Sequence, residues 1–445
     1  MHLLKWLYPG MRFKRWLFLF ALGVMLVSLG LAVVFNYKYI DNIEETIFRA
    51  VYLWTGTYNY MVTTIVGMVV IAAGVLIMLM ATRLIIRSVI TVLLPDNSDK
   101  LVDLIYEKRK LNKGPAVTVI GGGTGLSVLL RGIKEQTSNV TAVVTVADDG
   151  GSSGRLRAEL GIIPPGDLRN CLVALADTEP LMEKLFQHRF GGNSELAGHS
   201  FGNLFIAAMA EVTGDVEKAL KESSKVLAVK GRVLPASTAE VRLDATMEDG
   251  TIVKGESQIP LVKKKIERVH LFPKHVQPVQ SSLEAIKSAD AIILGPGSLY
   301  TSIMPNLLVD GMAEAVRESK AVKIYICNVM TQPGETDGYT AAMHAKAIID
   351  HAGVGAIDYV LVNSVEISPA MKAFYAERGA FPVIVDEEAL DALGVGYVKA
   401  DIISETNVIH HDPVKLSRAV MKMVYGLKSG AGMREYYMQQ DDRML

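Results

Sequence analysis

The chain has 445 residues, half of them hydrophobic, and a formal net charge of -1 at pH 7. This length exceeds one average domain, and the near-neutral charge argues against a nucleic-acid partner, which needs a basic surface. The two cysteines, Cys171 and Cys327, lie far apart without CxxC spacing. This arrangement argues against a disulfide framework or a cysteine zinc site and is typical of a reducing cytosol.

Two apolar runs without a charged residue stand near the start of the chain, over about 16–35 and 60–81. Each is long enough to cross the hydrocarbon core of a bilayer. Residues 1–90 are therefore predicted to form a membrane anchor of two transmembrane helices. A signal peptide for the first run, or two buried core helices, are the alternatives. The loop between the two runs has two basic residues, Lys38 and Arg49. More basic residues lie before the first run and just after the second, which places both termini in the cytoplasm by the positive-inside rule. These are Lys5, Arg12, Lys14, Arg15, Arg83 and Arg87.

The sequence changes character after the second run. Residues 91–115 are polar and charged and are predicted to form a linker with a short amphipathic helix. From 116 to about 430, short runs rich in Val and Ile alternate with helical stretches, which predicts an α/β fold with a Rossmann-like, doubly wound, mostly parallel sheet. Residues 431–445 read as a polar tail. The candidate strands are Ala116–Ile120, Ala142–Ala147, Ala291–Leu294, Val322–Cys327 and Tyr359–Val362.

One stretch of this domain has a different period. Residues 232–271 alternate apolar and polar side chains around the dipeptide Asp249-Gly250. Asp-Gly between alternating runs is a strong hairpin signal. We therefore predict an antiparallel β-hairpin insertion, serving as a lid or a dimer arm.

The first predicted strand runs directly into a glycine-rich turn that opens a helix. In a parallel sheet, ligands bind outside the carboxyl ends of the strands, and the free N–H groups of a helix N-terminus attract phosphate. Leu126 stands where the dinucleotide fingerprint needs its third glycine, and the Gly-Lys-Ser/Thr of the Walker motif is missing. A tight turn without a ligand is the alternative. The candidate ligand-binding residues are Gly121, Gly122, Gly123, Thr124 and Gly125.

Further turns combine glycine with acids, hydroxyl groups and arginine. An acid after the second strand could hold a ribose hydroxyl or a metal ion, and arginine can pair with phosphate. The alternatives are solvated loops, helix caps and a structural histidine. We expect the turns to converge on one cleft, with the loop 328–336 reaching over it. The candidates are Asp148, Asp149, Gly151, Ser152, Ser153, Arg155, Asp167, Asn170, His199, Ser200, Asn203, Gly295, Gly297, Ser298 and Thr301.

Six motifs in this order resemble the YvcK family of bacterial gluconeogenesis factors, which is related to the 2-phospho-L-lactate transferases of coenzyme F420 biosynthesis. They are GGGTG, TVADDGGSSGRLR, PPGDLRN, GHSFGN, GPGSLYTS and CNVMTQPGET. The resemblance implies binding of UDP-N-acetylglucosamine or a similar UDP-sugar, and a role in cell shape and growth on gluconeogenic carbon sources. It places Tyr375 where an aromatic residue stacks on the base. His410 and Pro413 depart from it, because arginine and threonine are frequent there.

Two functions from different classes follow from the resemblance. The first is a regulatory UDP-sugar-binding protein at the membrane, with its α/β domain in the cytoplasm and no required cofactor. Its expected partners are peptidoglycan-synthesis proteins and a second copy of the chain. The second is a metal-dependent phospholactyl-type transferase, in which Asp148 and Asp149 would bind Mg²⁺. Binding is favoured over catalysis because the sequence offers a phosphate cradle without an evident nucleophile. A nicotinamide dehydrogenase comes third, disfavoured by Leu126.

Overall fold

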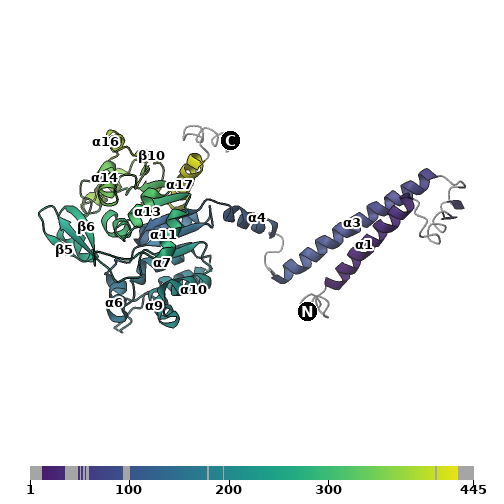
Figure 1. Ribbon diagram of the computed structural model, residues 1–445, viewed down its shortest axis with the longest axis horizontal. Coiled ribbons are helices and arrows are strands. Elements are labelled where there is room, and N and C mark those ends of the chain that lie inside the picture. Colours follow the sequence, from purple (N-terminus) through teal and green to yellow (C-terminus); the bar gives the residue numbers. More distant parts are fainter. Residues whose placement is uncertain are drawn as a thin grey trace. The chain divides into compact units, whose positions relative to one another are not determined.

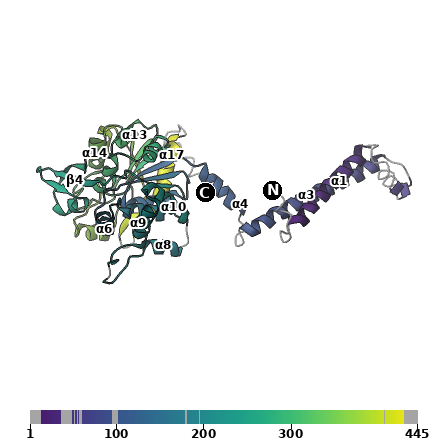
Figure 2. The same ribbon diagram turned by 60° about the horizontal axis from the view of Figure 1, so that its bottom comes forward.

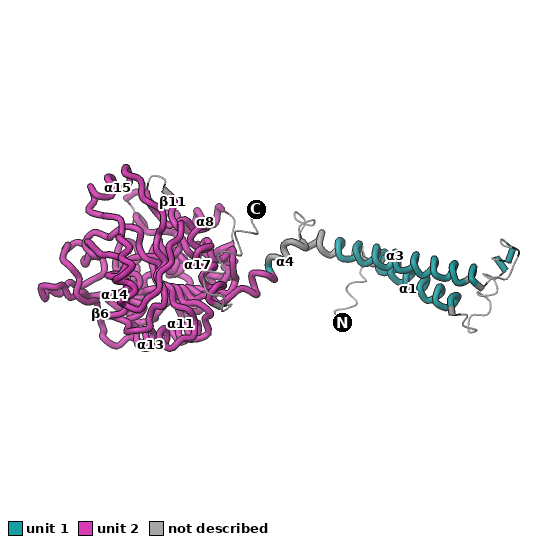
Figure 3. The backbone as a smooth tube through the Cα atoms, turned by 90° about the horizontal axis from the view of Figure 1, so that it is seen from above, with its two compact units in different colours: residues 1–108 teal, residues 109–445 magenta. Residues whose placement is uncertain are grey.

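The computed structural model describes residues 13–35, 49–50, 52–53, 56, 60–93, 101–177, 180–193, 195–405 and 408–428 (Figure 1). The chain forms two compact units, residues 1–108 and residues 109–445, which Figure 3 shows in different colours. The polar tail predicted at 431–445 lies outside the described residues.

The first unit contains two long helices, α1 (Phe13–Phe35) and α3 (Tyr60–Leu93). Both are long and apolar enough to cross a membrane. Glycines spaced seven residues apart line the seam between them: Gly23 and Gly30 on α1, Gly67 and Gly74 on α3. A Cβ on Gly30 would lie 2.8 Å from the carbonyl oxygen of Gly67, and one on Gly74 would lie 2.9 Å from that of Gly23. The two backbones are therefore in direct contact, as in glycine-mediated membrane helix pairs, and the seven-residue period keeps the seam continuous.

Replacing Gly74 by leucine is expected to force these helices apart. Overpacking of this kind costs about 1–3 kcal/mol, and a Cβ at this position already lies 2.8 Å from Cγ2 of Val27. All three tryptophans, Trp6, Trp16 and Trp54, belong to the first unit. Their fluorescence during SDS titration of the full chain in nonionic micelles therefore reports on this unit alone. We expect an earlier transition for Gly74→Leu.

The matched control is Leu76→Val, since the Leu76 side chain is 66% exposed. Its transition should coincide with that of the unmodified chain. A Gly74→Leu transition at the same SDS fraction would contradict the close glycine seam.

The second unit is built on a seven-stranded sheet in the order β10-β9-β8-β7-β1-β2-β3. Every pairing in it is parallel. The five predicted strands are present, although the second, predicted at 142–147, lies at 140–144, and the two edge strands β3 and β10 join them. The order reverses between β1 and β7, which makes this junction the topological switch point. The strands are β1 (Val117–Gly121), β2 (Val140–Val144), β3 (Arg232–Pro235), β7 (Ala291–Leu294), β8 (Val322–Ile326), β9 (Tyr359–Asn363) and β10 (Gly396–Ala400).

The predicted hairpin insertion proves to be a three-stranded antiparallel sheet, which projects from one edge of the unit (Figure 2). β4 (Arg242–Met247) pairs with β5 (Ile252–Lys254) across the Asp-Gly turn and with β6 (Ile266–Phe272). The first residues of the predicted stretch were assigned wrongly, because β3 at 232–235 belongs to the parallel sheet beside β2. Its buried Val233 continues the main core, whereas the insertion begins after the chain has left that sheet.

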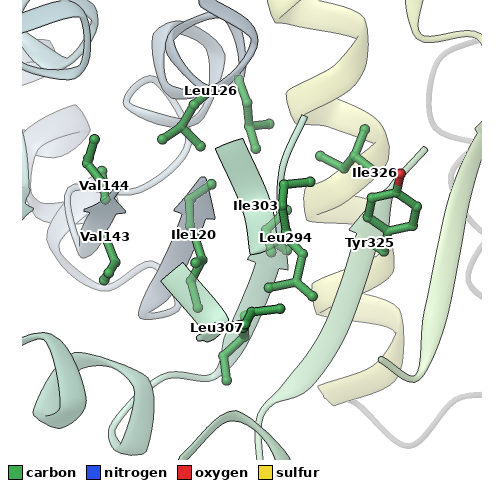
Figure 4. Packing of buried hydrophobic residues seen from close by; sticks show 14 of the residues in the cluster. Ile120, Leu126, Val143, Val144, Leu294, Ile303, Leu307, Tyr325 and Ile326 are labelled. Atoms are coloured by element: carbon green, nitrogen blue, oxygen red, sulfur yellow. The ribbon is translucent and has the colours of Figure 1, made fainter. Parts of the chain in front are cut away.

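Helices cover both faces of the parallel sheet. The central strands β1, β2 and β7 are buried along their whole length. Figure 4 shows Ile120 of β1 between Val143 of β2 and Leu294 of β7. The remaining elements of the unit are α5 (Gly123–Ile133), α6 (Gly151–Leu160), α7 (Pro165–Leu175), α8 (Pro180–Gln187), α9 (Phe201–Thr213), α10 (Val216–Val226), η4 (Glu256–Val262), α11 (Gln280–Lys287), η5 (Leu299–Ile303), α12 (Met304–Leu307), α13 (Met312–Glu318), α14 (Ala341–Ala352), α15 (Pro369–Ala376), α16 (Glu387–Ala392), β11 (Ile403–Glu405), β12 (Ile409–His411) and α17 (Pro413–Lys428); α4 (Leu101–Asn112) precedes β1.

Candidate functional site

Two glycine turns meet at the switch point of the sheet. The turn after β1 leads into α5, and the turn after β7 leads into η5. A Cβ on Gly125 would lie 2.8 Å from the carbonyl oxygen of Pro296, and one on Gly297 would lie 3.3 Å from that of Gly122. The two turns therefore touch backbone to backbone, which only glycine permits. The buried amide of Asn306 fixes their base by donating a 3.1 Å hydrogen bond to the Gly121 carbonyl.

A cleft of about 340 Å³ opens against these turns. The structure thus brings the two predicted glycine turns together, and the predicted loop 328–336 contributes to the same cleft. Tyr375 of α15 and the strand β12 complete the lining from the C-terminal part of the chain. The lining residues are Gly122, Gly123, Thr124, Gly125, Pro296, Gly297, Ser298, Ser302, Asn328, Val329, Met330, Gln332, Tyr375, Ile409, His410 and His411.

Tyr375 and the β11–β12 ribbon form one wall. The hydroxyl oxygen of Tyr375 accepts a 2.9 Å hydrogen bond from the backbone N–H of Ile409, which ties the ribbon to α15. His411 bonds to the backbone of Cys327, and burial lowers the pKa of its imidazole to about 4, so it is neutral at pH 7. His410, by contrast, is exposed on the ribbon. The ribbon is therefore held from two sides while one imidazole stays in water.

The N-terminus of α5 already carries an internal carboxylate. Asp167 accepts a hydrogen bond from the backbone N–H of Gly123. A Cβ on Gly122 would lie 2.6 Å from Oδ2 of Asp167, so the carboxylate is packed against the turn itself. Burial, reinforced by the nearby Asp148, raises the pKa of Asp167 to about 6. The first amide of the predicted phosphate cradle is therefore occupied by this acid.

The turn after β7 has the same feature. Ser298 donates to the carboxylate of Glu335, and Thr301 donates a 2.8 Å hydrogen bond to the Ser298 hydroxyl. Burial raises the pKa of Glu335, and its bonds to Ser298 and Thr301 oppose that shift. The two predicted hydroxyl groups are thus engaged by Glu335, which was not among the predicted site residues.

The insertion brings a further acid to the site. Burial, followed by repulsion from Asp148, raises the pKa of Glu256 in η4 to about 9. The neighbouring Ser257 N–H donates a 2.9 Å hydrogen bond to Asp149, which fixes η4 to the loop before α6. Glu256 was not predicted from the sequence, because no local motif indicates that its segment contacts the loop at Asp149, about a hundred residues earlier in the chain.

The other predicted candidates lie beside α6, α7 and α9 and do not line the cleft. Ser152 joins His199 at 3.0 Å and accepts a 3.1 Å hydrogen bond from Asn203. Burial lowers the pKa of His199. Ser200 caps α9, Arg155 donates to the Ala197 carbonyl, and Asn170 accepts from Arg169. Most of these polar groups thus have hydrogen-bond partners within the fold, although Oδ1 of Asn203 is buried without one. The candidates outside the cleft lining are Asp148, Asp149, Gly151, Ser152, Ser153, Arg155, Asp167, Asn170, His199, Ser200 and Asn203, together with Gly121, Gly295 and Thr301 of the two turns.

The suggested metal ligands do not form a metal site as they are placed. One oxygen of Asp148 accepts from the Gly150 N–H at 2.9 Å, and one of Asp149 accepts from Ser257. Over the described ranges, no group of three or more His, Cys, Asp and Glu side chains is arranged to hold a metal ion.

Known proteins share this domain. The family model described as 2-phospho-L-lactate transferase CofD matches residues 117–403. A gluconeogenesis factor from Halalkalibacterium halodurans is 58% identical over 307 residues, covering 69% of this chain and 95% of its own. One from Bacillus subtilis is 53% identical over 315 residues, covering 71% and 99%.

Two further matches define how far the similarity extends. A relative from Nostoc sp., provisionally described as a gluconeogenesis factor, is 46% identical over 429 residues, covering 96% of this chain and 93% of its own, so the similarity extends beyond the α/β unit. A crystal structure of a Bacillus halodurans protein superposes with a TM-score of 0.68 at 58% identity, covering 69% of this chain and 100% of that one. The chain therefore belongs to the YvcK family of gluconeogenesis factors, within the wider CofD family.

Proposed function

We propose that this chain is a membrane-anchored regulatory protein that binds a UDP-sugar, of the UDP-N-acetylglucosamine kind, in the cleft at the switch point. In this role it would support cell shape and growth on gluconeogenic carbon sources. The observation that carries the proposal is the backbone contact between the two glycine turns, because it builds a cleft at the place where α/β proteins bind nucleotides.

The chemistry of the cleft suits the parts of a nucleotide sugar. The backbone N–H groups of Thr124 and Gly125, in the first turn of α5, suit phosphate oxygens. On the opposite wall, the ring of Tyr375 suits stacking on a base, and its bond to Ile409 fixes its orientation. Asn328 donates a 3.1 Å hydrogen bond to the side-chain oxygen of Gln332, and the remaining oxygen of Asn328 and nitrogen of Gln332 match the edge of a pyrimidine.

The partners of the acids favour binding over turnover. A metal-bridged transferase needs carboxylates that are presented to the substrate. Asp149 is held by Ser257, and Glu335 is held by Ser298. The alternative function, a transferase of the phospholactyl type, is supported by the match to the CofD family model.

Calorimetric titration of the full chain in detergent, with Mg²⁺, separates these functions. We expect saturable binding of UDP-N-acetylglucosamine, none of NAD or GDP, and no product by mass spectrometry after prolonged incubation. Turnover that Asp149→Asn abolishes would establish the transferase instead. Tyr375→Ala should weaken binding strongly, whereas Tyr375→Phe keeps the ring and should bind nearly as well. Equal binding by both variants would remove Tyr375 from the site.

Membrane anchoring is tested separately. The full chain should sediment with phospholipid vesicles, whereas residues 109–445, which include all of the family-model match, should stay in the supernatant. Sedimentation of residues 109–445 with the vesicles would contradict an anchor limited to α1 and α3.

A further inference from the structure

Two carboxylates lie directly behind the glycine turns that line the cleft, Asp167 against Gly122 and Glu335 against Ser298. The N–H of Gly123 is the first amide of α5, and Asp167 takes it. Glu335 holds the hydroxyl of Ser298 on the facing turn. Both acids are therefore inserted where the two turns would otherwise offer donors to a phosphate.

Positive charge next to these acids is engaged elsewhere. The positive charge of Arg169 favours the ionised form of Asp167. One of its terminal nitrogens donates to the Ser200 hydroxyl, and the other donates to the amide oxygen of Asn170 at 2.7 Å. The two terminal nitrogens thus donate toward α9 and along α7, and they do not form a bidentate pair with a ligand at the glycine turn.

We propose that Asp167 determines the ligand class of the cleft by favouring a nucleoside diphosphate whose terminal phosphate is esterified, a nucleotide sugar, over the free nucleoside diphosphate. A free terminal phosphate carries up to one more negative charge near neutral pH than an esterified one. That extra charge would face the carboxylate of Asp167 across a single amide, where like charges repel strongly. This inference rests on the proposed function and adds to it a reason for the choice between a nucleotide sugar and its nucleotide.

The variant that tests this is Asp167→Asn. Asparagine keeps an oxygen that accepts from the Gly123 N–H and removes only the charge. The control is Asp391→Asn, which removes the same charge from an exposed position on α16. UDP-N-acetylglucosamine and UDP are titrated into the full chain in detergent at pH 7.5, where Asp167, with its pKa of about 6, is ionised. EDTA is present so that no cation bridges phosphate and carboxylate.

The unmodified chain and Asp391→Asn should prefer the UDP-sugar over UDP. Asp167→Asn should bind UDP roughly tenfold more tightly while its affinity for the UDP-sugar changes less. If Asp167→Asn does not fold, Glu335→Gln should shift the same ratio in the same direction. An unchanged ratio in every folded variant, or weaker binding of both ligands by Asp167→Asn, would overturn this inference alone. If neither ligand binds the unmodified chain, the proposed function fails and the inference fails with it.

Discussion

Glu256→Gln is expected to stabilise the α/β unit by about 3 kcal/mol at pH 7. The carboxyl of Glu256 has its pKa raised from 4.5 to about 9, first by burial and then by the other acids. The folded state therefore binds its proton more tightly than the unfolded state does. Glutamine has the same size and is neutral at every pH, so a chain with glutamine at position 256 folds without taking up a proton there.

The sign of the pH dependence follows from these two pKa values. The stability associated with protonated Glu256 is fully present below pH 4.5 and is lost as the pH rises toward 9. Between these limits the free energy of unfolding should fall by roughly 1.4 kcal/mol per pH unit. The difference between Glu256→Gln and the unmodified chain should accordingly be small at pH 4.5 and largest at pH 9.

Urea unfolding of residues 109–445, followed by circular dichroism at pH 5, 7 and 8.5, measures this difference. Glu248→Gln is the matched control, because Glu248 is an exposed acid on the same insertion that pairs with Lys265. It should leave the pH profile unchanged. Parallel profiles for Glu256→Gln and the unmodified unit would show that Glu256 is ionised and solvated at neutral pH.

The second large effect is expected at the contact between the glycine turns. Gly125→Ala should weaken binding of UDP-N-acetylglucosamine on the order of 100-fold, because a misplacement of about 1 Å in a binding site can have that effect. The new Cβ would lie 2.8 Å from the oxygen and 3.0 Å from the carbon of the Pro296 carbonyl, which are backbone atoms. The two turns must therefore separate to accept it.

Gly121→Ala is the control in the same turn. The nearest atom to a Cβ there is Cδ1 of Leu126 at 3.5 Å, an ordinary contact. Alanine is also the better helix former at position 125 by about 1 kcal/mol, so helix propensity opposes the predicted loss. Calorimetric titration of both variants should show weak binding only for Gly125→Ala. Equal affinities would place the ligand away from these turns.

The sheet could be predicted where its strands are continuous apolar runs. β1, β2, β7, β8 and β9 are such runs, because both of their faces are covered by helices. β3 and β10 escaped prediction since edge strands are only half buried. β10 alternates exposed Lys399 with buried Val398, and β3 begins with the exposed Arg232. Their place in the sheet depends on contacts with β9 and β2, which no local pattern encodes.

For the candidate site too, features that follow from a local pattern could be predicted, and features that depend on contacts between distant segments could not. The sequence indicated both glycine turns, since glycine density after a strand reflects a local backbone requirement. The sequence could not indicate that Glu256 and Asp167 would lie close together beside these turns, because they are far apart along the chain. It could not indicate their raised pKa values either, because these depend on burial in the assembled fold. Nor could it indicate that His199 would lie 3.0 Å from Ser152, because buried polar groups find partners that are distant in the sequence.

β1 occupies a special position along the chain. It follows α4 after a few residues, and it ends in the glycine turn. Both of its edges are hydrogen-bonded, to β2 on one side and to β7 on the other. A mechanical load that reaches the unit through residues 113–116 would therefore act on a strand in shear, and several hydrogen bonds on two sides would have to break together before the strand moved. A load pulling on residues 113–116 would therefore be borne by the hydrogen bonds of β1 with β2 and β7 at the centre of the sheet. The glycine turn at the other end of β1 would keep its geometry.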